Sequence, residues 1–410
     1  MRELPKIISV DDHVVEPAHV WNTWLPERFR QSGPRVIREK WAPFIHQPGA
    51  RYENTIDPEG TEGDAWLYED RLIYVQKSFV AIPQSATPDG IEGGFDRTKM
   101  QMIATTYDEM RPGCWDPHER VKDFEANHMD GSLPFPTFPR FCGQTFMDGN
   151  DKELGLACVR AYNDWMIEEW CEPTNGMNIP LCIIPLWDPV LAVEEVKRVS
   201  AKSVHAICFS EIPTKLGLPS IHTDHWDPLF QICNDNGVTL CMHIGSSSSM
   251  PAASPDAPEA VGSALQFNNA FASLIDWLFS GKMLRFPQLK LAYSEGQIGW
   301  IPYALERADI VWDIRDSWNH AKDTLKDPPS TQYYGRVFGC FTADAHGLKN
   351  LEAVGPKNIC FEIDYPHSDT TWPTSKAYAE NFVATQGLSE EVTYDVLRGN
   401  AIRMLSLDRT

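Results

Sequence analysis

Short apolar runs alternate with amphipathic stretches along most of the chain. The run VTLCMHIG, residues 238–245, consists of β-branched and long apolar side chains and ends in His243 and a glycine. This pattern predicts a buried strand whose last side chain emerges at the carboxyl end. The preceding stretch, which opens with Asp227-Pro228, has the cap and the spacing of a helix. The stretches that open with Asp116-Pro117 and Asp188-Pro189 predict helices by the same signature. Strands separated by helices predict a parallel sheet with right-handed crossovers.

The same alternation begins near the amino terminus with IISVDDHVV, residues 7–15, which predicts the first strand. Further apolar runs predict strands at 132–138, 178–187, 204–212, 289–296, 337–344 and 358–367. Stretches with helical spacing lie between most of them. About eight strands and about eight helices in this order predict an α/β protein, a (β/α)8 TIM barrel. We expect residues 1–410 to form this single domain.

The segment from about residue 30 to about residue 110 interrupts this order. It is rich in proline, glycine, tryptophan and tyrosine, and it shows little helical or strand periodicity. Such long segments usually carry function in compact proteins. We therefore expect a long irregular insertion after the first strand that covers the mouth of the barrel. With the Ser- and Pro-rich stretch after His243, it should form an aromatic-walled pocket, although a passive connector has a similar composition.

Side chains that ligate metals lie at the carboxyl ends of separate predicted strands. Asp11 and His13 share one face of the first strand because side chains alternate, whereas Asp12 points to the other face. Later strands end in three further candidates: His243, Glu295 and Asp364. The strand ends of a barrel converge on one mouth. Nitrogen and oxygen donors of these types bind zinc or manganese.

Each candidate ligand also has a purely structural interpretation. The first strand can end in an Asp-rich turn, and His243 can be a core histidine bonded to the backbone. The coincidence of several such residues with strand ends favours the metal site. The sequence therefore predicts one divalent metal ion, with zinc favoured over manganese and with four ligands: Asp11, His13, His243 and Asp364.

Composition narrows the choice of partners and compartment. The formal net charge of −21 repels nucleic acid and anionic lipid surfaces, so we expect neither as a partner. The ten cysteines stand singly without C-x-x-C spacing, mostly in apolar runs, which predicts reduced core thiols. The amino terminus has no apolar signal core, and no run of 18 apolar residues occurs. These features predict a cytoplasmic protein.

Four segments together resemble the amidohydrolase superfamily: SVDDHVVEP, HWDPLFQICNDNGVTLCMHIG, FPQLKLAYSEGQIGWIPYALERAD and NICFEIDYPHSDTTWP. The similarity is to the branch that contains the decarboxylases of aminocarboxymuconate semialdehyde, resorcylate and carboxyvanillate. It spans nearly the whole chain apart from the insertion. In that family the first-strand pair is His-x-His or Glu-x-His, which here falls on Asp11 and His13. The strand-five histidine and the strand-eight aspartate fall on His243 and Asp364.

The resemblance also implies functions for residues outside the ligand set. Where relatives carry a Gly-His pair, this chain reads Ser294-Glu295, so a carboxylate replaces an imidazole. Arg307 matches an arginine that contacts the substrate carboxylate, sometimes in a neighbouring subunit, which implies a homodimer or a higher homo-oligomer. Its alternative is a surface ion pair with Asp309 or Glu306.

These residues predict an enzyme with a small-molecule substrate. We expect Asp364, Glu295 and His243 to be catalytic. Arg307, His367 and Glu16 are the candidates for substrate binding, although His367 can also orient Asp364 or cap a loop. The favoured function is a metal-dependent hydrolase that acts on a small cyclic or aromatic compound through a metal-activated water. The alternatives are a non-oxidative decarboxylase of an aromatic or muconate-type acid and a barrel that binds without chemistry.

Overall fold

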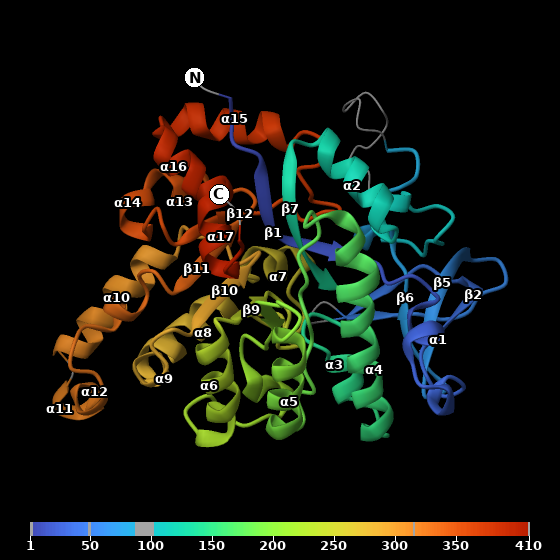
Figure 1. Cartoon of the computed structure of the whole chain (residues 1–410), viewed down its shortest axis with the longest axis horizontal. Helices are drawn as coiled ribbons and strands as arrows, with labels where there is room; N and C mark the ends of the chain where they lie inside the picture. Colours follow the sequence, from blue (N-terminus) through green and yellow to red (C-terminus); the bar gives the residue numbers. More distant parts are fainter. Residues whose placement is uncertain (1–2, 48–50, 87–101, 315, 409–410) are drawn as a thin grey trace. The chain divides into compact units, whose positions relative to one another are not determined.

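The computed structural model describes residues 3–47, 51–86, 102–314 and 316–408 (Figure 1). Internal contacts divide the chain into two compact units. We call Lys6–Trp187 with Ile363–Ala379 the first unit, because it contains the first strand. The second unit comprises Asp188–Glu362 with Glu380–Thr410 and Met1–Pro5.

The second unit is built on a five-stranded parallel sheet with the order β12-β11-β10-β9-β8. Each strand therefore pairs with its neighbour in sequence, as the alternation of strands and helices predicts. The strand residues are almost all buried, which is typical of parallel sheets. The strands are β8 (Ala206–Cys208), β9 (Thr239–His243), β10 (Lys290–Ser294), β11 (Val337–Phe341) and β12 (Ile359–Phe361).

Helices separate these strands along the chain (Figure 1). The helix predicted before His243 is present, and so is the one predicted after Asp188-Pro189, whose first turn the Asp188 carboxylate caps. The stretch expected to be a loop after His243 contains a short helix. The helices between the strands include α5 (Pro189–Ser200), α6 (Asp227–Asn236), α7 (Glu259–Leu265), α8 (Asn268–Phe279) and α10 (Ile301–Ile314). After β12 follow α15 (Ser375–Gln386) and α17 (Asn400–Leu405).

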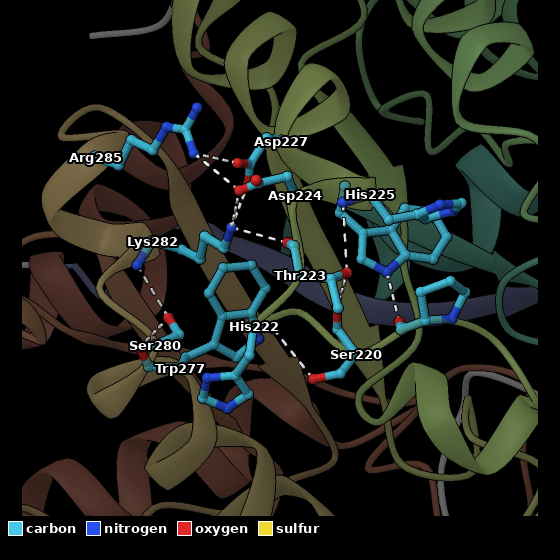
Figure 2. A network of polar contacts seen from close by, with 12 residues as sticks. Ser220, His222, Thr223, Asp224, His225, Asp227, Trp277, Ser280, Lys282 and Arg285 are labelled. Atoms are coloured by element: carbon cyan, nitrogen blue, oxygen red, sulfur yellow. Dashed lines mark hydrogen bonds and ion pairs between the residues drawn. The ribbon is translucent and has the colours of Figure 1, made fainter.

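A buried ion pair joins the start of α6 to the short helix α9 (Lys282–Arg285). Lys282 Nζ donates to Asp227 Oδ1 at 2.5 Å and to the Thr223 carbonyl at 2.9 Å (Figure 2). Arg285 forms a second ion pair with the same aspartate. Since α6 leads directly into β9, these contacts fix the helix that precedes the strand of His243.

The first unit contains β1 (Ile7–Val14), which pairs in parallel with β7 (Met129–Pro136). The helix directly before β7 is α2 (Pro117–Ala126). It begins where the sequence predicts, because the Asp116 carboxylate accepts hydrogen bonds from the backbone N–H groups of the first helical turn. The other long helix is α4 (Lys152–Trp165).

The strand predicted at 178–187 is wrong as a regular element. Asn178 makes an isolated bridge to Ser132 of β7 and Cys182 forms another isolated bridge, but no continuous ladder follows. Pro180 and Pro185 cannot donate to a strand ladder. The Asn163 side chain replaces a strand partner, since its amide bonds both the N–H and the carbonyl of Ile183, each at 2.9 Å.

The insertion is more regular than expected. It holds a three-stranded antiparallel sheet, with the order β2-β5-β6, and a two-stranded hairpin, β3 with β4. A cluster of Trp41, Ala65, Val75 and Ala104 forms its small core. Residues 87–101 of the insertion lie outside the described residues. The strands are β2 (Arg35–Trp41), β3 (Ile45–Gln47), β4 (Arg51–Glu53), β5 (Thr61–Tyr68) and β6 (Arg71–Val75).

The turn between β5 and β6 shows why the sequence does not predict this hairpin. Glu69 and Asp70 both have positive φ, 49° and 58°, as a two-residue type I′ hairpin requires. This turn normally uses Asn-Gly or Asp-Gly, so Glu-Asp gives no sequence signal.

The ten cysteines are buried and free of disulfides, which confirms the prediction of reduced core thiols. Among the described helices, none is both long and apolar enough to cross a membrane.

Candidate active site

In the first unit, the end of β1 and the segment that begins at Ile363 bring four predicted site residues together. The Asp364 N–H donates to the Asp11 carbonyl at 2.9 Å, which joins the two segments. His13 Nε2 lies 3.1 Å from Asp364 Oδ1 and 3.7 Å from Asp11 Oδ1. His367 Nδ1 also lies 3.1 Å from Asp364 Oδ1. Its ring stacks on that of His13 with a centroid separation of 3.6 Å.

This cluster fits a divalent cation by its donor chemistry. His13, Asp364 and His367 are buried, and each offers one ligand atom within 4.8 Å of the other two. Two imidazole nitrogens and a carboxylate oxygen suit zinc or manganese. The sequence predicts that His367 binds substrate. In the structure, His367 is also a candidate metal ligand, beside His13 and Asp364.

Asp12 points away from this cluster, as strand alternation predicts. Its carboxylate accepts hydrogen bonds from the Ser132 hydroxyl at 2.6 Å and from the Tyr365 N–H at 3.0 Å. Asp12 therefore ties β1 to β7 and to the segment that carries Asp364.

In the second unit, His243 ends β9 and is buried. Its Nδ1 lies 2.6 Å from the Ile244 carbonyl, which can only accept, so Nδ1 carries the proton. In the neutral ring this leaves the Nε2 lone pair as the basic site, the tautomer that a metal ligand requires. His243 Nε2 lies 3.6 Å from Glu295 Oε2, which places the two predicted catalytic side chains next to each other.

Glu295 follows β10 in the left-handed region with φ 53°, and Asp364 has φ 55°. Non-glycine residues rarely adopt this conformation, and such strain clusters at functional sites. The Glu295 N–H donates to both oxygens of the buried Glu362 carboxylate, at 3.2 and 3.3 Å. Glu362 is not among the site residues predicted from the sequence. A charged residue directly after the apolar run of β12 is the signal that could have found it.

Glu211, which follows β8, is a second buried carboxylate that was not predicted from the sequence. Its Oε1 accepts hydrogen bonds from the Ser247 hydroxyl at 3.0 Å, the Asn269 amide at 3.0 Å and the Gly245 N–H at 3.3 Å. Burial raises the pKa of Glu211 to about 7, although these hydrogen bonds act in the opposite direction. Glu211 thus holds the backbone that directly follows His243.

The structure gives no support to substrate binding by Glu16. It is fully buried, and its two oxygens accept hydrogen bonds from the N–H groups of Thr137 and Phe138, each at 2.9 Å. Burial raises its pKa to about 7. Both oxygens are therefore engaged in holding the turn after β7.

Arg307 lies exposed on α10, and none of the described residues forms an ion pair with it. The alternative partner Asp309 instead accepts hydrogen bonds from the N–H and the hydroxyl of Ser330, at 2.9 and 2.7 Å. The surface ion pair considered for Arg307 with Asp309 is therefore not formed.

Comparison with known proteins identifies the fold and the family. The amidohydrolase family matches residues 18–407, which includes His243, Glu295, Asp364 and His367 but begins after Asp11 and His13. The chain is similar to 2-amino-3-carboxymuconate-6-semialdehyde decarboxylase of Dictyostelium discoideum, with 23% identity over 329 residues, 76% of this chain and 82% of the relative.

The chain is also similar to solved structures of amidohydrolases and decarboxylases. An amidohydrolase from Mycobacterium avium subsp. paratuberculosis matches 98% of this chain and 99% of its own, with a TM-score of 0.70 and 20% identity. A 5-carboxyvanillate decarboxylase from Novosphingobium aromaticivorans, solved with manganese and 4-hydroxy-3-methoxy-5-nitrobenzoic acid, matches 72% of this chain and 82% of its own, with a TM-score of 0.57 and 17% identity. These matches confirm the predicted TIM-barrel fold. The chain belongs to the amidohydrolase family and is a metal-dependent enzyme, a hydrolase or a carboxy-lyase.

Proposed function

We propose that the protein is a metal-dependent hydrolase that acts on a small cyclic or aromatic compound. The observation that carries this proposal is the 3.6 Å distance between Glu295 Oε2 and His243 Nε2. A carboxylate next to a strand-end histidine is suited to accept the proton of a nucleophilic water. Relatives of the decarboxylase branch carry histidine at this position, and the exchange to glutamate supplies a group that is a base when ionised.

The candidate metal donors of the first unit support the same chemistry. When bound, a divalent cation lowers the pKa of water toward neutrality and polarises a substrate oxygen. His13, Asp364 and His367 have the donor atoms for it. The full ligand set of Asp11, His13, His243 and Asp364 stays a prediction from the sequence. Zinc is our prediction from the sequence, and the manganese in the carboxyvanillate decarboxylase makes that ion the second to test.

Aromatic side chains around these donors support a planar substrate. The Phe141 ring lies edge-on to His13 at a centroid distance of 5.9 Å, and the Phe79 ring lies 5.8 Å from His367. Phe79 comes from the insertion and is 42% exposed although it borders a buried histidine. The Ser368 N–H donates to the Phe79 carbonyl at 3.0 Å, which fixes this part of the insertion next to the donors. An exposed phenyl group in this position can stack on an aromatic ring.

The second candidate function is non-oxidative decarboxylation of an aromatic or muconate-type acid. Similarity to decarboxylases that act on such acids favours it. In this reaction an acid protonates the ring carbon as carbon dioxide leaves, and a cationic side chain offsets the charge of the substrate carboxylate. Exposed Arg307 is the candidate for that contact in a neighbouring subunit, which makes a homodimer part of this second proposal.

The two functions differ in what happens to water. Protein loaded with zinc or manganese is incubated with aryl esters, lactones and amides and, separately, with hydroxylated benzoic acids, in water labelled with oxygen-18. Hydrolysis incorporates the label into the organic product, whereas decarboxylation releases carbon dioxide and leaves the organic product unlabelled. Label-free product with carbon dioxide release from an aromatic acid would refute the hydrolase and establish the second candidate.

Glu295→Gln tests the role of the carboxylate. The change keeps the size of the side chain and removes its titrating group, so turnover should fall about 100-fold or more. Glu306→Gln, an exposed glutamate of the same unit, is the matched control and should leave turnover unchanged. Near-normal turnover in Glu295→Gln would exclude proton transfer by this residue.

A further inference from the structure

Arg120 is a fully buried arginine on α2 whose hydrogen bonds all go to main-chain carbonyls. Its Nε donates to the Gly113 carbonyl at 2.5 Å, and its Nη2 donates to the His13 carbonyl at 2.7 Å and to the Cys114 carbonyl at 3.3 Å. Among the described residues, no carboxylate forms an ion pair with it. The guanidinium is therefore held by the end of β1 and by the turn that precedes α2.

The same guanidinium also contacts the segment that carries Asp364 and His367. Its carbon lies 4.4 Å from the ring centroid of Tyr365, which directly follows Asp364 in that segment. The Tyr365 carbonyl accepts the His13 N–H at 2.6 Å, and the Tyr365 hydroxyl donates to Asp123 at 2.5 Å. Arg120 thus touches both chain segments that supply the candidate metal donors of the first unit.

Packing alone does not account for a cation here. Burying a charge without a direct ion pair costs free energy, and an apolar side chain of similar length would fill the space without that cost. The planar fork of arginine can bond several carbonyls at once while its face lies on an aromatic ring, which lysine cannot reproduce. The carboxyl groups of Asp12 and Asp123 interact electrostatically with Arg120, although burial raises the pKa of Asp12 to about 7.

We propose that Arg120 is a positioning residue that fixes His13 relative to Asp364 and His367. It does so by holding the carbonyl of His13 on one side and the ring of Tyr365 on the other. Outer partners that orient the ligands of a metal commonly change metal affinity by about 10-fold to 100-fold when they are removed. This inference rests on the proposed metal-dependent function.

The test uses Arg120→Lys, which keeps the charge but not the fork, and Arg120→Met, which keeps most of the stem. The control is Arg38→Lys in the same unit, where Arg38 forms a two-pronged ion pair with Asp64 at 2.8 and 2.9 Å and contacts neither segment. Competition with a chelator measures the affinity for manganese. Hydrogen exchange of the metal-free proteins, followed by mass spectrometry, measures how firmly peptides covering 9–15 and 363–368 are held.

We expect manganese affinity to fall about 10-fold or more in Arg120→Lys and further in Arg120→Met, and to stay within about twofold of wild type in Arg38→Lys. Exchange should become faster in both peptides only in the Arg120 variants. Unchanged affinity in a folded Arg120→Lys protein would overturn the inference. If wild-type protein binds no manganese or zinc, the proposed function fails. Hydrogen exchange then decides alone whether Arg120 holds the two segments, and unchanged exchange refutes it.

Discussion

Glu211→Gln should remove a pH dependence of stability that comes from one buried carboxyl group. Burial raises the pKa of Glu211 to about 7 from a usual value of 4.5. Between these values the folded protein keeps a proton that the unfolded chain has released. The stability contributed by this proton is therefore fully present below about pH 4.5 and is lost as the pH rises through about 7.

The size of the effect follows from the difference between the two pKa values. Each pH unit of difference corresponds to about 1.4 kcal/mol, so the rise from 4.5 to about 7 amounts to about 3 kcal/mol at alkaline pH. Glutamine keeps the Oε1 acceptor for Ser247, Asn269 and the Gly245 N–H. Its amide group takes the place of Oε2, which has no hydrogen-bond partner among the described residues. The variant therefore preserves the contacts and removes the titration.

Urea denaturation of both proteins from about pH 5 to about pH 8 measures this effect. The free energy of unfolding of Glu211→Gln relative to wild type should rise by about 2.5 kcal/mol over that range. Comparison at each pH cancels the contributions of other buried carboxyl groups, such as Asp12 and Glu16. Glu59→Gln, at an exposed position, is the control and should show no such trend. A difference that stays constant with pH would refute the reasoning.

Three further outcomes are expected. Lys282→Met removes the buried ammonium partner of Asp227 and leaves only Arg285 to pair with it, so the free energy of unfolding should fall by about 2 kcal/mol. Arg285→Met, at a largely exposed position, should cost under about 1 kcal/mol. Equal losses in urea denaturation would contradict the assigned burial. His243→Ala should abolish the binding of about one equivalent of divalent metal measured by elemental analysis, and unchanged metal content would remove His243 from the ligand set. Phe79→Ala should raise KM for an aromatic substrate about 10-fold with little change in kcat, and an unchanged KM would remove Phe79 from the substrate pocket.

The sequence alone determined the elements whose signal is local. The apolar run before His243 and the cap at Asp116 fix a strand and a helix by rules that involve only neighbouring residues. Strand alternation also placed Asp11 and His13 apart from Asp12, as their contacts now show. The order of strands and helices was enough to predict a parallel sheet, because only such connections join parallel strands.

Tertiary structure decided what depends on distant partners. The segment 178–187 reads as a strand, but prolines and the Asn163 side chain take the place of a ladder. The hairpin at Glu69-Asp70 forms because long-range pairing of β2, β5 and β6 overrides a weak turn sequence.

The candidate active site also depends on contacts between residues that are distant in the sequence. Glu16 and Glu211 have similar chemistry in the sequence, and only folding shows one carboxylate holding the turn after β7 and the other holding the loop after His243. His367 is a candidate donor because folding brings its ligand atom within 4.8 Å of that of His13, a residue more than 350 positions away in the chain. Contacts between residues so far apart depend on how the whole chain packs, and a local pattern carries no information about them.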